Sequence, residues 1–337
     1  MNFLRNIIIF GILLVCDSST SSAGDKKPLS HKCPTQSIDK KLVISVLAVG
    51  QGDSTFIRTP NGTTVLIDAG NPGRGNSDII PTLKKCYKVS SIDYVILTHP
   101  HADHFGGLPE ILNAFSVKKA IYDTGYGKGV KFEKFAALAD STHKRSIPKL
   151  GETAIVSGDG VKFKLVAING EILGGKRVNV FKKNGEPTDV NSVSIAIVIE
   201  YGKFRYFTAG DISGGGNNTP DVESPVADVV GRVDVMKSNH HGSATANNPY
   251  LMNKLRPKQI LISVGDGETN SRYHLPNEHT IALFMSLPFV EKVYQTAKGE
   301  GRAPASIQAK VKNENTDITI IATPEKYWLG QHEFNLN

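Results

Sequence analysis

The side chains best suited to chemistry lie in one short segment, Thr98-His99-Pro100-His101-Ala102-Asp103-His104. Three of the chain's ten histidines and one aspartate fall within six consecutive positions there. Imidazole and carboxylate groups are ligands that zinc, manganese and iron take in proteins. The segment directly follows the apolar run 94–97, which predicts a buried strand, so one rigid turn would present all four groups. A polar loop rich in histidine is the alternative, but the dense clustering favours a metal site.

Further acidic and imidazole side chains follow other apolar runs along the chain. They are Asp53, Asp68, Asp211 and the pair His240-His241. In layered α/β folds, residues that follow strands can converge at one edge of the sheets. Any single aspartate here could be a turn former or a cap. Their repeated occurrence after strands, together with the histidine segment, favours one shared site.

The elements that must position these residues alternate along the chain without a linker. Strands are expected at 42–49, 54–58, 64–67, 92–97, within 114–123, and at 154–156, 161–167, 194–201, 204–208, 233–236, 259–264, 292–295 and 317–322. Helices are expected at 78–87, 131–139, 249–255 and 278–287. Mixed strands and helices over such a stretch predict one α/β domain with two sheets and outer helices.

The N-terminal residues predict a cleaved secretion signal at 1–23, followed by a leader at 24–40. A charged start is followed by the apolar stretch 6–16, which is too short to span a bilayer comfortably, and Ser21-Ser22-Ala23 fits a cleavage site. The protein is therefore expected to be extracellular or periplasmic. Retention by the signal, or by a lipid on Cys16, is the alternative. No later stretch is long and apolar enough to cross a membrane.

The net charge and the cysteine content indicate which binding partners and which cellular compartment to expect. The formal net charge of +7 favours an anionic partner, such as nucleic acid or anionic lipid, although spread lysine pairs are usually solvated surface. The sequence shows no aromatic and basic platform of the kind that binds single strands. Export would permit Cys33 and Cys86 to pair, but sequence alone does not show that their Cα atoms approach closely enough.

Several of these segments together resemble the metallo-β-lactamase fold superfamily, and more closely its ComEC-like branch, the hydrolase domain of bacterial competence proteins. The resemblance covers roughly residues 42–322. The His-x-His-x-Asp-His string at 99–104 carries the resemblance to the superfamily, and the remaining segments, in order, carry the resemblance to the branch. These segments are Val49-Gly50-Gln51-Gly52-Asp53-Ser54, Ile67-Asp68-Ala69-Gly70, Asn191-Ser192-Val193-Ser194, Thr208-Ala209-Gly210-Asp211, Lys237-Ser238-Asn239-His240-His241-Gly242-Ser243, Ile262-Ser263-Val264-Gly265 and Val293-Tyr294-Gln295-Thr296.

The resemblance implies an αββα sandwich over residues 41–337, with one or two divalent ions, zinc or manganese, at one edge of the sheets. By that match, His99 and His101 would hold the first metal, and Asp103 and His104 would hold the second. Asp211 would bridge the two, because a carboxylate has two oxygens to share.

The resemblance also implies residues that complete and support the ligand set. His240 or His241 would complete the second metal position, and His240 is favoured. Asp68 would accept a hydrogen bond from the ring nitrogen of a ligand histidine that does not bind the metal, and so fix the tautomer of that ring. The residues expected to support the ligands are Asp68, Asp53, Asn191 and Ser194.

Two departures from the family pattern bear on the site. Asn191-Ser192-Val193-Ser194 stands where many superfamily members supply a further histidine to the first metal. We therefore expect that metal to be weakly held, more open to water, or absent until substrate binds. Near the C-terminal end, the branch shows Asn-x-Tyr-Gly-His-Pro, whereas this chain has Asn270-Ser271-Arg272-Tyr273-His274-Leu275-Pro276. A surface position is therefore the alternative for His274.

We accordingly expect a secreted metal-dependent phosphodiesterase or nuclease that cleaves extracellular DNA with a metal-activated hydroxide, since a bound metal lowers the pKa of water to roughly 7. Asp103 would orient the nucleophile. The candidates for steadying the phosphate or protonating the leaving group are His274, Tyr273 and Lys237. Lys237 could equally be a structural contact beneath its strand. The alternatives are hydrolysis of a small phosphodiester, such as a phosphorylcholine ester, or of a lactone, and a non-catalytic module that binds anions.

Overall fold

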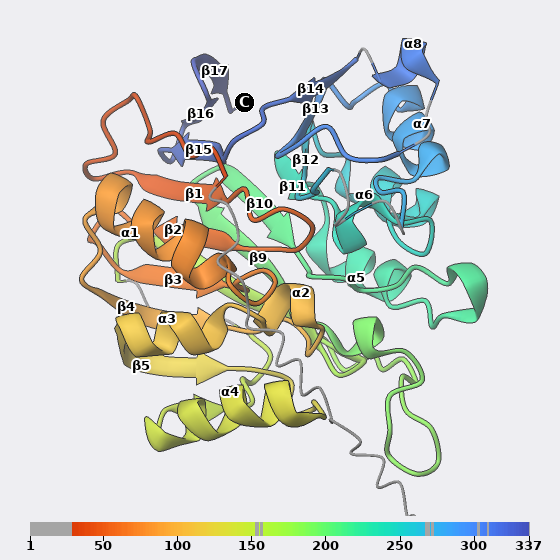
Figure 1. Ribbon diagram of the computed structural model, residues 1–337. Coiled ribbons are helices and arrows are strands. Elements are labelled where there is room, and N and C mark those ends of the chain that lie inside the picture. The colour runs from red at the N-terminus through yellow and green to blue at the C-terminus, as the bar shows by residue number, and fades with distance from the viewer. Residues whose placement is uncertain are drawn as a thin grey trace, which may run out of the picture.

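Two β-sheets form the centre of the computed structural model, which describes residues 29–151, 155, 158–266, 270, 273–301, 304–308 and 310–336 (Figure 1). Within these residues one sheet has nine strands, in the order β17 (His332–Asn335), β16 (Lys326–Leu329), β15 (Ile318–Ala322), β1 (Leu42–Val46), β2 (Thr55–Arg58), β3 (Thr64–Ile67), β4 (Ser91–Ile96), β5 (Ser116–Tyr122) and β6 (Arg145–Ser146). The other has eight, in the order β14 (Val311–Asn313), β13 (Lys292–Gln295), β12 (Gln259–Ile262), β11 (Val235–Lys237), β10 (Phe204–Thr208), β9 (Ala196–Tyr201), β7 (Val161–Ile168) and β8 (Glu171–Ile172).

Helices cover the outer face of each sheet, which gives four layers in the order helix, sheet, sheet, helix. The facing sheets share a core that includes Ile44, Phe163 and Ile197. A second core lies between the first sheet and its covering helices, α1 (Ile80–Tyr87), α3 (Leu108–Ala114) and α4 (Val130–Ser141). A third lies between the second sheet and α5 (Glu223–Val230), α6 (Pro249–Leu255) and α7 (Glu278–Ser286). These layers confirm the predicted αββα sandwich.

The order of apolar residues explains how the outer helices attach. In α4 the buried residues are Phe132, Phe135 and Ala139, whose spacing of three and four places them on one face. Helix α6 begins at Asn248, whose side chain accepts a hydrogen bond from Leu251 N, and Pro249 follows in the first turn. Capping and patterning therefore fix both the start of the helix and the face that it buries.

Parallel pairing brings the polar strand ends to one edge of the molecule. Strand β3 runs parallel to β4 and β4 to β5, while β10, β11 and β12 are parallel in the other sheet. Asp68 and His99 follow β3 and β4, and Asp211 and His240 follow β10 and β11. In Figure 1 the short helix α2 (Ala102–Phe105) lies just beyond the ends of the β3 and β4 arrows.

The predicted elements agree with the observed ones wherever an apolar run was long. Strands β1 to β4 and helices α4, α6 and α7 lie where the sequence predicts them, with ends that differ by a few residues. The expected signal at 1–23 and most of the strand expected at 154–156 lie outside the described residues. The sequence analysis missed α5 and the short strands β6, β8, β14, β16 and β17. It also missed the short helices α8 (Ala305–Gln308), η1 (Gly75–Ile79), η2 (Val190–Val193), η3 (Gly216–Asn218) and η4 (Asn239–Gly242).

A disulfide ties the segment before β1 to the end of helix α1. Cys33 and Cys86 are bonded, with their Cα atoms 4.9 Å apart and a sequence separation of 53 residues. Two residues earlier, the His31 ring contacts Asp317 Oδ1 at 2.8 Å and Asp78 Oδ1 at 3.1 Å. The start of the described chain is thus fixed against the rim of the first sheet. Over the residues that the structure describes, no helix has the length and apolarity needed to cross a membrane.

Candidate metal centre

The turn after β4 and the helix α2 hold the histidine segment rigidly. His99 and His104 are fully buried, and His104 N donates to His101 O at 3.0 Å. The β1–β2 turn packs directly on this segment, because Asp53 N donates to Asp103 O at 3.0 Å. A Cβ atom at Gly52, where φ is +139°, would lie 2.5 Å from Asp103 O. The close approach therefore requires glycine at that position.

Ring nitrogens from two segments, 99–104 and 240–241, converge around the Asp211 carboxylate. Its Oδ2 lies 3.3 Å from His104 Nε2, 3.6 Å from His241 Nε2 and 3.8 Å from both His99 Nε2 and His240 Nε2. His99 Nε2 is in turn 3.0 Å from the Nδ1 atom of His101. Asp211 thus lies between the two groups of predicted ligands, and its role as a bridging carboxylate stays a prediction.

The two adjacent histidines on η4 face different surroundings. His241 is buried, its Nδ1 lies 2.9 Å from Ser263 O, and its Nε2 lies 3.2 Å from Asp103 Oδ2. His240 is partly exposed, and its Nδ1 lies 3.0 Å from Thr245 Oγ1. His241 is therefore the residue directed at Asp103, while the preference for His240 in the second metal position stays a prediction.

Two aspartates support the cluster from the interior. Asp68 Oδ2 lies 2.8 Å from His104 Nδ1 and accepts from Thr98 Oγ1 at 2.7 Å, while its Oδ1 accepts from Thr98 N at 2.8 Å. The Nε2 atom of His104 is thereby left to face the site. Asp53 Oδ2 lies 2.5 Å from the buried Lys237 Nζ, which also donates to Ser238 O.

Lys237 is therefore not placed as the sequence analysis suggested for a catalytic group. Its side chain is 2% exposed, and it does not line the cavity at the site. The ammonium pairs with Asp53, so it holds the β1–β2 turn instead of reaching a substrate. The alternative of a structural contact beneath the strand fits this position. Asp53 is also close to the ligand atoms, since one of its oxygens lies within 4.8 Å of atoms of His104, Asp211 and His241.

The surrounding carboxylates favour cations at the site. Burial opposes protonation of His104, but nearby carboxylates, Asp211 foremost, outweigh it and raise its pKa well above the usual value. Burial likewise opposes protonation of His241, but the carboxylates of Asp211, Asp53 and Asp103 raise its pKa to about 9. At His99, burial and the adjacent charge of His104 lower the pKa well below the usual value. Divalent ions would compete with protons for the nitrogens of this negatively charged site.

Several buried polar atoms lack a well-aligned hydrogen bond, and a bound cation would be a partner for those at the site. Buried atoms of this kind, among the residues that the structure describes, include His104 Nε2, His241 Nε2, Asp211 Oδ1 and Asn191 Oδ1. Leaving such atoms without partners in a protein interior is costly, and a metal ion would satisfy those that face the site. The donor set of imidazoles and carboxylates is also the one that zinc and manganese prefer.

A cavity of about 610 Å³ opens onto the cluster. It is lined by His101, Asp103, Asp211, His240 and His241, and also by Gln51, Asn71, Ala102, Asn191, Tyr273 and Leu275. Of the other predicted site residues, Ser194 Oγ accepts from Asp211 N at 3.3 Å, and His274 is not among the lining residues. Gln51 and Asn71 were missed, although both lie in or beside glycine-rich turns that the sequence analysis singled out.

Comparison with known proteins finds a matching family model and several similar proteins. The family model described as "Metallo-beta-lactamase superfamily" matches residues 47–223. ComE operon protein 3 of Bacillus subtilis (strain 168) is 27% identical over 261 residues, which cover 71% of this chain and 30% of the relative. Recombination protein 2 of Haemophilus influenzae is 28% identical over 260 residues, which cover 76% of this chain and 27% of the relative. The chain thus spans less than a third of the length of these relatives.

Among solved structures, Tm1679, described as a metal-dependent hydrolase of the beta-lactamase superfamily, matches with a TM-score of 0.45 at 14% identity. The match covers 75% of this chain and 95% of that chain.

Proposed function

Because the chain belongs to the metallo-beta-lactamase superfamily, we propose that it is an exported metal-dependent phosphodiesterase that cleaves nucleic acid, with DNA as its substrate. The observation that carries the proposal is the cluster of buried imidazoles and carboxylates around Asp211, open to a cavity of about 610 Å³. The family and the cluster support a metal-dependent hydrolase. The choice of DNA rests on the arguments below.

The donor atoms would provide two metal positions that share Asp211. His99 and His101 would hold the first ion, since their ring nitrogens lie 3.0 Å apart beside Asp211. Asp103, His104 and His241 would hold the second. The first position would have fewer protein ligands, and Asn191 and His240 both line the cavity at the site.

A divalent ion bound here would supply Lewis acidity at a phosphoryl oxygen and a water of lowered pKa. The chain's own groups would orient the reactants. Asp103, at the cavity wall, would accept a hydrogen bond from the attacking water. The ring of His240 and the hydroxyl of Tyr273 both border the cavity, where they would contact the phosphate and donate a proton to the leaving oxygen. Lys237 has no part in this step, because Asp53 holds it in the interior.

Three observations support nucleic acid and export. The net charge of +7 favours a polyanionic substrate. Two relatives carry the names ComE operon protein 3 and Recombination protein 2, and recombination is a reaction of DNA. The Cys33–Cys86 disulfide is typical of proteins in oxidising compartments, in agreement with the signal predicted at 1–23.

A cleavage assay tests the proposal. The purified protein would be incubated with supercoiled plasmid, single-stranded DNA or RNA, in manganese, zinc or magnesium and with an EDTA control. We expect metal-dependent cutting of DNA that the Asp103→Ala/His104→Ala variant loses. The matched control is Asp140→Ala/His143→Ala, an exposed aspartate–histidine pair far from the cluster in the fold. Protein that binds metal and leaves every polymer uncut would refute the nuclease proposal and direct attention to small phosphodiesters and lactones.

A further inference from the structure

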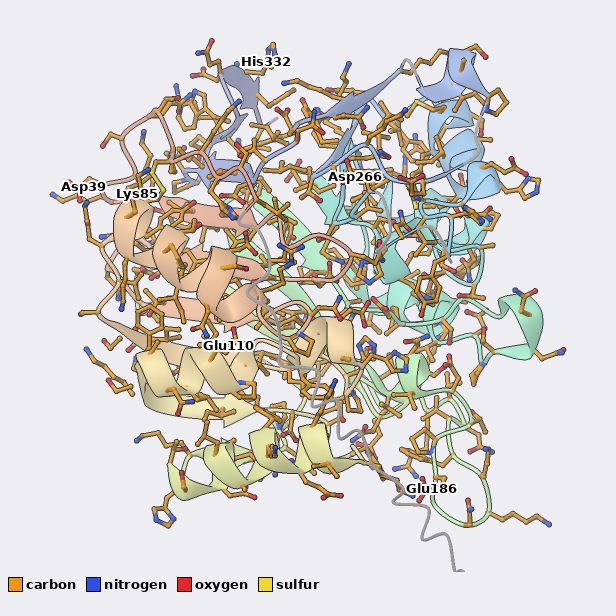
Figure 2. All side chains as sticks on the ribbon, in the orientation of Figure 1. Asp39, Lys85, Glu110, Glu186, Asp266 and His332 are labelled. Atoms are coloured by element: carbon orange, nitrogen blue, oxygen red, sulfur yellow. A yellow bond between two sulfur atoms is a disulfide. The ribbon has the colours of Figure 1, made fainter. Side chains whose placement is uncertain are left out.

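A second cavity, of about 860 Å³, lies on the same side of the fold as the metal centre. One wall comes from the segments that follow β5 and β6, including Tyr126, Ile147 and Lys149. The other wall comes from the hairpin-like segment 176–189, including Arg177, Asn179 and Phe181. Figure 2 shows Glu186 at the tip of this segment, which projects away from the layered body. None of the site residues predicted from the sequence lines this cavity.

Backbone contacts place the second cavity beside the metal centre. Asn169 lines it, and Asn169 N donates to Val193 O at 3.1 Å. Val193 ends η2, whose Asn191 lines the cavity at the metal centre. The side chain of Asn169 also donates to Thr124 O at 2.9 Å, just beyond β5. A single short segment therefore separates the two cavities. A chain-like ligand of more than one unit could occupy both.

The walls of the second cavity are aromatic and aliphatic. The rings of Tyr126 and Phe181 lie 4.8 Å apart at an interplanar angle of 36°, and each is partly exposed. Ile147 is 56% exposed, which is unusual for a large apolar side chain. Asn179 Oδ1 accepts from Phe181 N, which holds an amide group at the rim of the same cavity. Flat apolar surface with amides at its rim suits a planar heterocycle.

The rim of this cavity carries both signs of charge, with more basic than acidic side chains, since Lys149 and Arg177 line it together with Glu171. Lys149 is exposed there, and Arg177 lies at the opposite wall, where it pairs with Glu171. The projecting segment adds Lys182 and Lys183, both exposed, while Lys128 Nζ contacts Glu186 Oε1 at 2.7 Å and ties its tip to the loop after β5. A ligand that has both a flat apolar part and negative charge matches these walls and this rim, and a nucleotide has both.

We propose that the second cavity is a nucleoside-binding subsite that takes one unpaired base of a single-stranded DNA whose neighbouring phosphodiester lies at the metal centre. The catalytic part of this statement rests on the proposed function. A base exposes its faces for stacking on Tyr126 and Phe181 only when it is unstacked and unpaired. The subsite therefore makes the enzyme prefer single strands to duplex.

The test begins with binding in EDTA, where no cleavage occurs. Fluorescence anisotropy with the full chain would compare a labelled single-stranded 10-mer of thymidylate with a duplex of equal length. Phe181→Ala removes one ring, and Ile147→Trp fills the cavity from a position too exposed to disturb the core. Phe289→Ala, at another partly buried phenylalanine, is the matched control. Thermal unfolding verifies that Phe181→Ala, which borders the core, remains folded.

We expect tighter binding of the single strand than of the duplex by the unmodified protein. Phe181→Ala and Ile147→Trp should each weaken single-strand binding by at least about fivefold, since stacking of a base on an aromatic ring is worth that much or more. Duplex binding, and all binding by Phe289→Ala, should be unchanged. Single-strand affinity in both cavity variants equal to that of the unmodified protein would overturn the subsite.

Cleavage separates the subsite from the proposed function. In a single strand with one abasic position moved along it, cutting near that position should fall in the unmodified protein, and Phe181→Ala should remove this dependence. If the variants cut and bind as the unmodified protein does, the subsite is wrong and the nuclease stands. If no polymer is cut while the binding differences hold, the subsite stands and the nuclease proposal fails.

Discussion

His240 and His241 are neighbours in the sequence, but hydrogen bonds of their Nδ1 atoms, with Thr245 Oγ1 and to Ser263 O respectively, turn their rings toward different parts of the site. We predict that His241→Ala loses about one metal ion per chain, because Nε2 of this residue lies 3.2 Å from Asp103 Oδ2. His240→Ala should retain that ion. Elemental analysis after gel filtration measures the difference, and equal metal loss in both variants would contradict the assignment.

Asp68 allows a sharper test of how one hydrogen bond orients a ligand. In Asp68→Asn the carbonyl oxygen still accepts from Thr98 N, but the amide nitrogen faces His104 Nδ1, which favours the wrong tautomer. Metal affinity should fall roughly 10- to 100-fold, the usual effect of losing such a partner, in a competition titration with a chelator. The control is Asp93→Asn, since Asp93 accepts from Thr64 N and Oγ1 in the same way, away from the site. Similar affinity in the two variants would rule out the orienting role.

The sequence predicts which residues form the site better than it predicts the directions in which their side chains face. Spacing alone predicts that His99, His101, Asp103 and His104 lie together, because all four sit on one turn and one helix. It does not predict which way a ring faces, since that depends on partners such as Ser263, which is distant in the sequence. Tyr126 and Phe181 were not recognised as a pair for the same reason: only the fold brings them together.

At the scale of elements, helix α5 holds the loop that presents His240 and His241. Glu223, buried in its first turn, accepts from Asn239 Nδ2 at 2.7 Å, from Asn247 N at 2.5 Å and from Asn248 N at 2.7 Å. Glu223→Ala would leave three donors unpartnered, so we predict a loss of about 3 kcal/mol in stability and lower metal occupancy. Glu278→Ala, in the first turn of α7 and partly exposed, is the control. Unfolding curves and metal analysis measure both effects, and full metal occupancy in Glu223→Ala would refute the role of α5.

The sequence predicts correctly those helices and strands whose own residues show a clear apolar pattern. The five residues of β1 are all buried, and such a run predicts a central strand by itself. The strands β14 and β16 have only three and four residues, which is too few to show a period. Helix α5 was missed because Glu223-Ser224-Pro225 interrupts the apolar pattern, although proline is well tolerated in a first turn.

At the scale of the whole molecule, the N-terminal segment gives stability a dependence on pH. Burial opposes protonation of His31, but hydrogen bonds and charge from Asp317 and Asp78 outweigh it and raise its pKa from 6.5 to about 9. The protonated ring therefore stabilises the folded chain fully below pH 6.5, and this contribution is lost as the pH rises through 9. It is on the order of 3 kcal/mol.

Unfolding at a series of pH values should thus show His31→Ala less stable than the unmodified protein at pH 6, with the gap closing towards pH 9.5. His143→Ala, at an exposed loop position, should show no such gap. A constant difference across this range would mean that His31 contributes packing and not charge.

The balance of charge over the whole chain predicts how activity responds to salt. When a protein neutralises phosphates of a nucleic acid, counterions are released, so the binding affinity falls steeply as the salt concentration rises. The slope of log affinity against log salt concentration is about −0.7 for each single-strand phosphate neutralised. With about three phosphates neutralised, affinity for single-stranded DNA should drop roughly twentyfold between 50 and 200 mM salt. Lys182→Gln/Lys183→Gln should reduce the slope by about one, because these lysines lie on the segment beside the second cavity.

The control for that slope is Lys84→Gln/Lys85→Gln, which removes the same charge from α1; Figure 2 shows Lys85 and Glu186 at opposite corners of the view. The slope should be unchanged in this variant, since a charge far from the bound strand contributes little beyond a Debye length of about 8 Å at 0.15 M salt. A small phosphodiester such as bis(4-nitrophenyl) phosphate should be cleaved with a KM nearly independent of salt, because it carries a single charge. If DNA and the small ester responded to salt alike, the positive surface would have no part in binding, and a small molecule would be the better substrate.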